Sequence, residues 1–151
     1  MSLLITNLTR FQIDKKWLEK IGQRIWQVLG LGDHREVGLV LVTPNRIQEL
    51  NKQFRHKDKV TDILSFNYRE AGTARGVFFG HTGDVWGDLV VCLKQIKDQA
   101  RGVKKSWQAE LTEVLIHGIL HLTGQNHTDS ASLKAMQDKT MSVLKGLNFK
   151  F

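Results

Sequence analysis

Apolar residues follow two different periods along the chain, and these periods divide it into candidate strands and helices. Short, nearly continuous apolar stretches predict four β-strands, at residues 2–8, 36–42, 61–68 and 85–92. Apolar positions spaced three and four apart predict a helix from Asp14 to Leu29 and a second helix that starts with Thr43 and Pro44. Three more helices are predicted near residues 94–101, 106–123 and 129–147.

The order of these elements predicts the fold class. Strands and helices are interspersed, so we expect one α+β domain over residues 1–151, with a small mixed β-sheet of about four strands and helices packed against it. Residues 70–84 contain four glycines and predict a loop. No apolar run approaches the roughly 18–20 residues of a membrane span, so we expect neither a membrane anchor nor a signal peptide.

Cysteine content and charge narrow the expected compartment and partners. Cys92 is the one cysteine, so no internal disulfide can form, which suits a reducing compartment. We therefore expect a cytoplasmic protein. Lysine and arginine number 22 against 15 acidic residues, and the net charge of +7 favours a polyanionic partner such as nucleic acid.

Three histidines gather in the segment HGILHLTGQNH, at residues 117–127. His117 and His121 are four residues apart, which on a helix places both rings on one face. On a continued helix His127 would lie about 15 Å along the axis from His117, too far to share an ion. Gly124 offers a break, because glycine takes the left-handed conformation that ends helices. The chain can then fold back and bring His127 to the same metal ion.

Three imidazoles leave one tetrahedral position open, which is typical of a catalytic rather than a structural zinc site. The spacing HxxxHxxGxxH equals that of the metzincin proteases, and it predicts a zincin-like site on a central helix. Those proteases carry a glutamate as general base directly after the first histidine, where this chain has Gly118. Gly118 leaves open space beside the metal, although close packing of the helix against a neighbour explains a glycine equally well.

The histidine segment resembles the signature HGxLHLxGxDH of the YbeY family, bacterial and organellar metal-dependent endoribonucleases. LNKQFRHKDKVTDILSF at residues 50–66 is similar to that family's LNxxYRxxxxPTDVLSF, and GDLVV at residues 87–91 to its GDIxI strand. The likeness covers most of residues 36–147. Asn126 stands where the family usually has Asp, and Val60 where Pro is common.

The resemblance implies a function and its residues. His117, His121 and His127 would bind one Zn²⁺ ion. The same three ligands would also suit other divalent transition metals. Arg55 would clamp the scissile phosphate, because a guanidinium fork matches its oxygens. The activity implied is single-strand-specific cleavage of RNA in maturation of the 3′ end of small-subunit (16S) rRNA and in ribosome quality control. The implied partners are the rRNA precursor and ribosomal proteins or a ribosome-associated GTPase.

Two groups of basic residues are candidate contacts for RNA. Lys57 and Lys59 lie close to Arg55, and Lys94, Lys97 and Arg101 share one stripe of a predicted helix. Such residues can follow a phosphate backbone, and an ordinary solvated helix face explains the stripe as well.

Other interpretations of the same residues stay open. Asp62 and Ser65 either support the site or serve only as a turn cap and a strand residue. A metal hydrolase of another substrate, such as a peptide, is one alternative function, against which Gly118 speaks. A non-enzymatic ribosome-assembly factor with a structural metal is the other.

Overall fold

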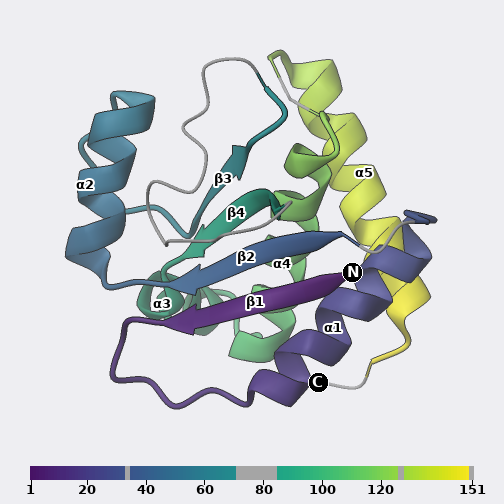
Figure 1. The fold of residues 1–151 in the computed structure, drawn as a ribbon, viewed down its shortest axis with the longest axis horizontal. Helices are drawn as coiled ribbons and strands as arrows, with labels where there is room; N and C mark the ends of the chain where they lie inside the picture. Colours follow the sequence, from purple (N-terminus) through teal and green to yellow (C-terminus); the bar gives the residue numbers. More distant parts are fainter. Residues whose placement is uncertain (33–34, 71–84, 126–127, 150–151) are drawn as a thin grey trace.

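A sheet of three parallel strands and one antiparallel edge strand organises the protein (Figure 1). The structure is a computed structural model that describes residues 1–32, 35–70, 85–125 and 128–149. The strands are β1 (Ser2–Asn7), β2 (Glu36–Leu41), β3 (Ile63–Asn67) and β4 (Val85–Val91). The helices are α1 (Lys15–Val28), α2 (Pro44–Arg55), α3 (Leu93–Gly102), α4 (Trp107–Leu122) and α5 (Ser130–Leu147).

The strand order in the sheet is β1-β2-β4-β3. β1, β2 and β4 run parallel, and β3 pairs antiparallel with β4 so that Ser65 lies opposite Leu89. The predicted α+β class with a small mixed sheet of about four strands is therefore confirmed. The strand predicted at residues 61–68 is shorter, and it follows a bend at Asp62, whose carboxylate accepts a hydrogen bond from the backbone N–H of Ile63 at 2.7 Å.

Helices cover both faces of this sheet, and each face has its own hydrophobic core. The larger core lies between the sheet and the helices α1, α3, α4 and α5, with Leu39, Leu89 and Leu115 fully buried in it. On the opposite face α2 packs Ile47 and Leu50 against Leu64 and Phe66 of β3. Because β3 alternates its side chains between the two faces, Ile63 and Ser65 point toward α4.

Local capping sets where the helices begin. Asp14, Thr43, Ser106 and Asp129 each accept a hydrogen bond from a backbone N–H in the first turn of the helix that follows. The predicted starts at Asp14 and Thr43 are thus confirmed.

Burial raises the pKa of the thiol of Cys92, which follows β4 and lies fully buried in the core on the α2 face.

The glycine-rich loop predicted at residues 70–84 lies, apart from residue 70, outside the described residues. The sequence predicted no membrane-spanning segment, and the helices of the structure can be compared with that prediction. Within the described ranges, no helix is both long enough and apolar enough to cross a bilayer.

Candidate active site

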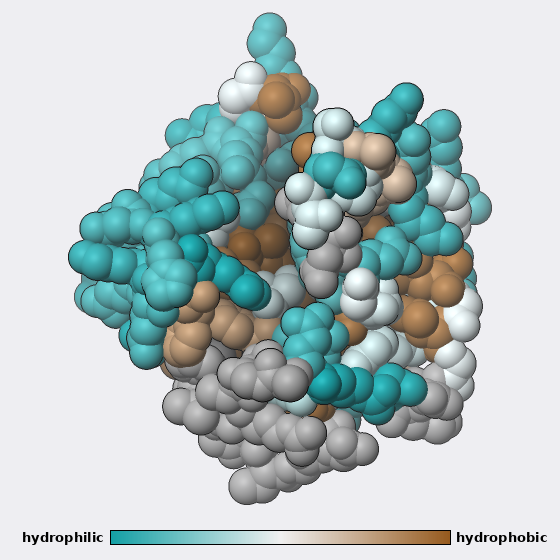
Figure 2. Space-filling model, turned by 90° about the horizontal axis from the view of Figure 1, so that it is seen from above, coloured by the Kyte–Doolittle hydropathy of each residue, from teal (hydrophilic) through white to brown (hydrophobic). Residues whose placement is uncertain are grey.

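A groove of about 1080 Å³ separates the end of α2 and strand β3 from helices α4 and α5. Figure 2 shows the hollow between the hydrophilic surface over α2 and the surface of the helices opposite, with apolar residues in its depth. The side chains that line it come from segments far apart in the sequence, among them Arg55, Lys57, Asp62, His117 and Met141. The fold thus brings most of the predicted site residues that it describes to one place.

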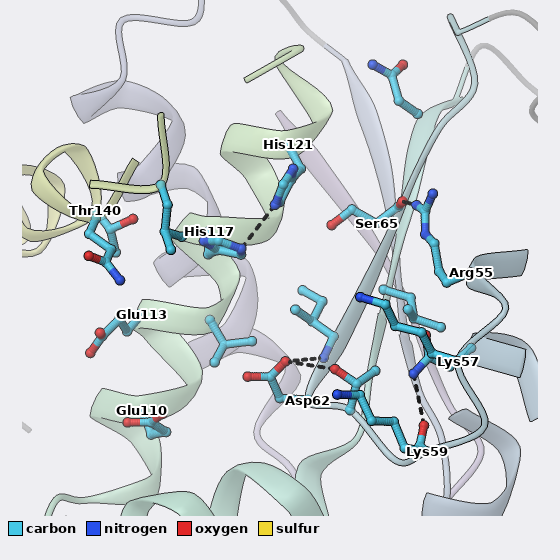
Figure 3. A pocket seen from close by; sticks show the side chains of 18 of the residues that line it. Arg55, Lys57, Lys59, Asp62, Ser65, Glu110, Glu113, His117, His121 and Thr140 are labelled. Atoms are coloured by element: carbon cyan, nitrogen blue, oxygen red, sulfur yellow. Dashed lines mark hydrogen bonds between the residues drawn. The ribbon is translucent and has the colours of Figure 1, made fainter. Parts of the chain in front are cut away.

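His117 and His121 project from α4 into this groove (Figure 3). Their Nε2 atoms lie 3.0 Å apart, and the two rings meet edge to face at 79°. Two nitrogens bound to one tetrahedral zinc ion lie about 3.3 Å apart, given zinc–nitrogen distances near 2.05 Å. The pair therefore converges on one point from one helix face, as the spacing predicted, and the donor set suits a transition-metal ion.

The end of α4 has the geometry that the glycine predicted. Gly124 takes φ +88°, and its N–H donates to the carbonyl of His121 at 3.0 Å. The N–H of Gln125 donates to the carbonyl of Leu120 at 3.2 Å. These two bonds form a Schellman motif, which turns the chain away from the helix axis. The predicted third ligand, His127, and the neighbouring Asn126 lie outside the described residues.

Gly118 faces the sheet rather than the groove, and this decides between the two interpretations of that position. A Cβ atom there would lie 2.6 Å from Cδ1 of Ile63 and 2.9 Å from Cδ2 of Leu89. The expectation of open space beside the metal was wrong, because α4 packs so closely on β3 and β4 that a side chain at this position would have to displace Ile63 and Leu89. The close-packing alternative is correct, and a general base at this position would be directed into the core.

Arg55 is the last residue of α2, which ends as His56 takes the left-handed conformation at φ 58°. Its Nη2 donates to the backbone carbonyl of Ser65 at 2.7 Å, and its guanidinium lies 5.6 Å from the centre of the Phe66 ring. The side chain is exposed and lines the groove across from the histidine pair (Figure 3). Contacts with Ser65 and Phe66 of β3 thus fix the position of the Arg55 side chain.

Asp62 and Ser65 lie in the groove and also have the local structural bonds of the second interpretation. The Asp62 carboxylate accepts from Ile63, and the Ser65 hydroxyl donates to the carbonyl of Gly118 at 3.4 Å. Ser65 is therefore one of the residues through which β3 contacts the histidine helix, together with Asn67, whose Nδ2 donates to the carbonyl of Leu122 at 3.1 Å.

The two predicted basic groups lie in different places. Lys57 and Lys59 line the groove on the same side as Arg55, and neither pairs with an acidic side chain of the described residues. Lys94, Lys97 and Arg101 stand on α3 and are not among the groove residues. Lys94 and Arg101 both pair with Asp98, at 2.5 and 3.7 Å. The Lys97 amine lies 4.3 Å above Phe11 and 5.2 Å above Trp107.

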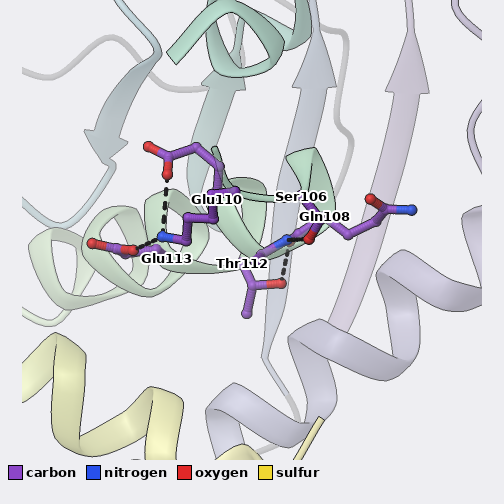
Figure 4. Close-up of polar contacts among 7 residues, drawn as sticks. Ser106, Gln108, Glu110, Thr112 and Glu113 are labelled. Carbon is purple, nitrogen blue, oxygen red and sulfur yellow. Dashed lines mark hydrogen bonds and ion pairs between the residues drawn. The ribbon is translucent and has the colours of Figure 1, made fainter. Parts of the chain in front are cut away.

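Sequence reasoning missed the acidic side of the groove. Glu110 and Glu113 line it from α4 and Asp138 from α5, and Lys105 forms ion pairs with both glutamates (Figure 4). Partial burial alone would lower the pKa of the Lys105 amine, but its hydrogen bonds with Glu113 and Glu110 outweigh that effect and raise the pKa. A signal existed in the spacing, because Glu113, His117 and His121 recur every four residues on one helix face.

Comparison with known proteins identifies the family. The family model described as Endoribonuclease YbeY matches residues 5–148, nearly the whole chain. The chain belongs to the YbeY endoribonuclease family. The family resemblance inferred from the sequence is thereby confirmed.

Curated relatives and one solved structure agree with this assignment. An endoribonuclease YbeY from Sulfurihydrogenibium is 36% identical over 88% of this chain and 85% of its own. One from Pelotomaculum thermopropionicum is 34% identical over 98% of both chains. A protein from Thermotoga maritima, known from its solution structure, is 31% identical and superimposes with a TM-score of 0.62 over 95% of this chain and 89% of its own.

Proposed function

We propose that this YbeY-family protein is a metal-dependent endoribonuclease that cleaves single-stranded RNA in the groove between α2 and α4. The observation that carries the proposal is the pair of imidazole nitrogens 3.0 Å apart, facing an arginine across the groove. A metal ion held by such a pair and a guanidinium can both stabilise the negative charge that develops on a phosphodiester during cleavage. The names of the relatives, all endoribonucleases, support RNA as the substrate.

His117, His121 and His127 would hold the metal ion, with Zn²⁺ the best match and other divalent transition metals compatible. Bound there, zinc would supply Lewis-acid chemistry at neutral pH. The half-buried positions of His117 and His121 favour this role, because α4 fixes both rings while one side stays open to the groove. The Schellman turn at Gly124 supports the return of His127, since it redirects the chain three residues before that histidine.

Arg55 would bind the scissile phosphate. Its guanidinium carries N–H donors in a planar fork, and its hydrogen bond to the Ser65 carbonyl comes from Nη2 alone. That bond orients the fork, and the edge remaining toward the groove can bind two phosphate oxygens. As negative charge grows on those oxygens during cleavage, a fixed guanidinium stabilises it at little cost in reorganisation.

The cellular task that fits the family is maturation of the 3′ end of small-subunit (16S) rRNA, together with ribosome quality control in the cytoplasm. We propose the rRNA precursor as the substrate, and ribosomal proteins or a ribosome-associated GTPase as partners. The net charge of +7 supports a polyanionic substrate. Lys57 and Lys59 extend the cationic surface beside Arg55 and would bind neighbouring phosphates.

The peptide-hydrolase alternative loses support at Gly118. A protease of the zincin type needs a general base next to the first histidine to protonate the leaving amine, and here that position is filled by the packing of α4 on Ile63 and Leu89. A phosphodiester has an alkoxide leaving group, and its cleavage in this groove requires no group at position 118.

One assay separates the three functions. The metal-loaded protein is incubated with a single-stranded RNA, with the same RNA as a duplex, and with a peptide panel, and the products are resolved by gel and mass spectrometry. The proposal expects cleavage of the single strand alone, abolished in His121→Ala purified in parallel, which controls for contaminating nucleases. Peptide cleavage would favour the hydrolase alternative, and a metal-loaded protein inert toward every substrate would favour the assembly factor.

A further inference from the structure

The groove is electrically asymmetric across its width. One side, the basic wall, is formed by Arg55, Lys57 and Lys59, at the end of α2 and in the segment that follows. The other side, the acidic wall, carries the carboxylates of Glu110, Glu113 and Asp138 on α4 and α5. Figure 3 shows Glu110 and Glu113 on the helix that carries the histidine pair, with Arg55, Lys57 and Lys59 across the groove from them.

The acidic wall keeps a net negative charge in spite of Lys105. That single amine pairs with both Glu110 and Glu113, so one cation stands against two carboxylates. The two glutamates line the groove, whereas Lys105 is not among the groove residues. Asp138 adds a third carboxylate and forms no ion pair within the described part of the chain.

Exposed apolar side chains stand on the same side as these carboxylates. Leu133 and Met141, on α5, are 38% and 49% exposed, and both line the groove. They are two of the five large hydrophobic residues that stay exposed among the described ones. An unstacked nucleobase is flat and apolar on its faces, with hydrogen-bonding groups on its edges, so it suits a surface of this mixed kind.

We propose, resting on the function proposed above, that the two walls bind opposite sides of one RNA strand, its phosphates on one wall and its bases on the other. Phosphates lie along the basic wall, and the bases turn toward Leu133 and Met141. A duplex presents phosphates on both of its outer sides, so its second backbone would meet Glu113 and Asp138, and like charges repel it. The acidic wall is thus the element that makes the groove specific for single strands.

Acidic groups also occur elsewhere in the groove, and they do not cancel the asymmetry. Asp62 lies in the floor, where its carboxylate accepts bonds from Ile63 and Thr61. Glu70 lies after the end of β3. Neither belongs to α4 or α5, and the single Asp62 carboxylate stands against the three cations of the basic wall.

The first test measures the ratio of affinities for a short unstructured RNA and for its duplex, by fluorescence anisotropy with a chelator present so that no strand is cleaved. Asp138→Asn removes one charge from the acidic wall, and Glu19→Gln removes one from the exposed face of α1 as a matched control. We expect Asp138→Asn to lower the preference for the single strand about threefold and Glu19→Gln to leave it unchanged.

The second test asks which wall meets the bases. Met141→Ser is compared with Val103→Ser, an exposed apolar residue outside the groove, on an RNA strand and on an abasic strand of equal length. We expect Met141→Ser to weaken binding of the RNA about threefold, with no change for the abasic strand or for the control.

Each result has a defined meaning. The inference would be overturned if Asp138→Asn left the ratio of single-strand to duplex affinity unchanged. It would also be overturned if Met141→Ser weakened binding of the RNA strand and of the abasic strand equally. In both cases, single-strand binding by the wild type would leave the proposed function standing. A wild-type protein that binds neither RNA would remove the proposed function, and the inference with it.

Discussion

The guanidinium of Arg55 donates from Nη2 to the backbone carbonyl of Ser65, 2.7 Å away. The Ser65 hydroxyl in turn donates to the carbonyl of Gly118 on the histidine helix, at 3.4 Å. One strand residue thus connects the proposed phosphate clamp with the helix that carries His117 and His121. Because β3 pairs with β4 along its length, this connection rests on the rigid part of the fold rather than on a loop.

Replacing the proposed phosphate clamp should separate metal binding from catalysis. Arg55→Ala is expected to leave the zinc content unchanged and to reduce cleavage of single-stranded RNA about 10²-fold or more, because it removes charge stabilisation of the reacting phosphate. Arg55→Lys keeps the charge but loses the fork, so we expect it to recover only part of the activity. Turnover numbers on single-stranded RNA check this, and wild-type turnover in Arg55→Ala would exclude the residue from the mechanism.

The close approach of α4 to the sheet means that any side chain at position 118 must displace Ile63 and Leu89. Gly118→Ala should destabilise the protein by about 1–3 kcal/mol, because its Cβ would overlap Ile63 and Leu89 in the core. Gly102→Ala, at the end of α3 with no atom within 4 Å of the new Cβ, is the matched control. We expect it to be neutral or to stabilise the protein by up to about 1 kcal/mol. Urea unfolding measures both, and equal stabilities for the two variants would contradict the packing described.

The left-handed residue after α4 should matter for both stability and the metal. Gly124→Ala forces an L-residue to φ +88°, which costs about 1 kcal/mol and loosens the turn toward His127. Gly32→Ala, whose new Cβ also meets no atom within 4 Å, controls for loss of a glycine. Zinc affinity by competition with a chromophoric chelator should fall in Gly124→Ala and stay at the wild-type value in Gly32→Ala. An unchanged zinc affinity in Gly124→Ala would mean that this turn does not position a ligand.

The two basic groups should differ in their contribution to RNA binding. Lys57→Gln is expected to weaken binding and to reduce the slope of log K against log salt by about one, because one phosphate contact is lost. Lys94→Gln should have a smaller effect, since that amine already pairs with Asp98 on α3 and lies outside the groove. Titrations at several salt concentrations check this, and a larger loss in Lys94→Gln would place the RNA on α3.

Much of this fold was predictable because its signals are local. The periods of apolar residues located each described strand and helix to within about two residues, and Gly124 indicated the helix end through its tolerance of positive φ. The family signature predicted that Arg55 and the histidines share one site, and the groove brings Arg55, His117 and His121 together.

The rest depends on contacts between distant segments. Nothing near Gly118 in the sequence shows that Ile63 and Leu89 will press against it, so its orientation toward the sheet needed the tertiary structure. The same holds for the acidic wall, since Asp138 reaches the groove only because α5 packs along α4. A local pattern can also point to residues outside the site. Lys94, Lys97 and Arg101 share one face of α3, as predicted, but that face lies outside the groove.

The most direct test of the central claim is elemental analysis of the purified protein, wild type and His121→Ala, with single-stranded RNA cleavage measured on the same samples. The account predicts one zinc or equivalent transition-metal ion per wild-type chain, and loss of both the metal and the cleavage in the variant. A His121→Ala protein that keeps a full equivalent of metal would contradict the assignment of His121 as a ligand, and with it the metal centre proposed for this groove.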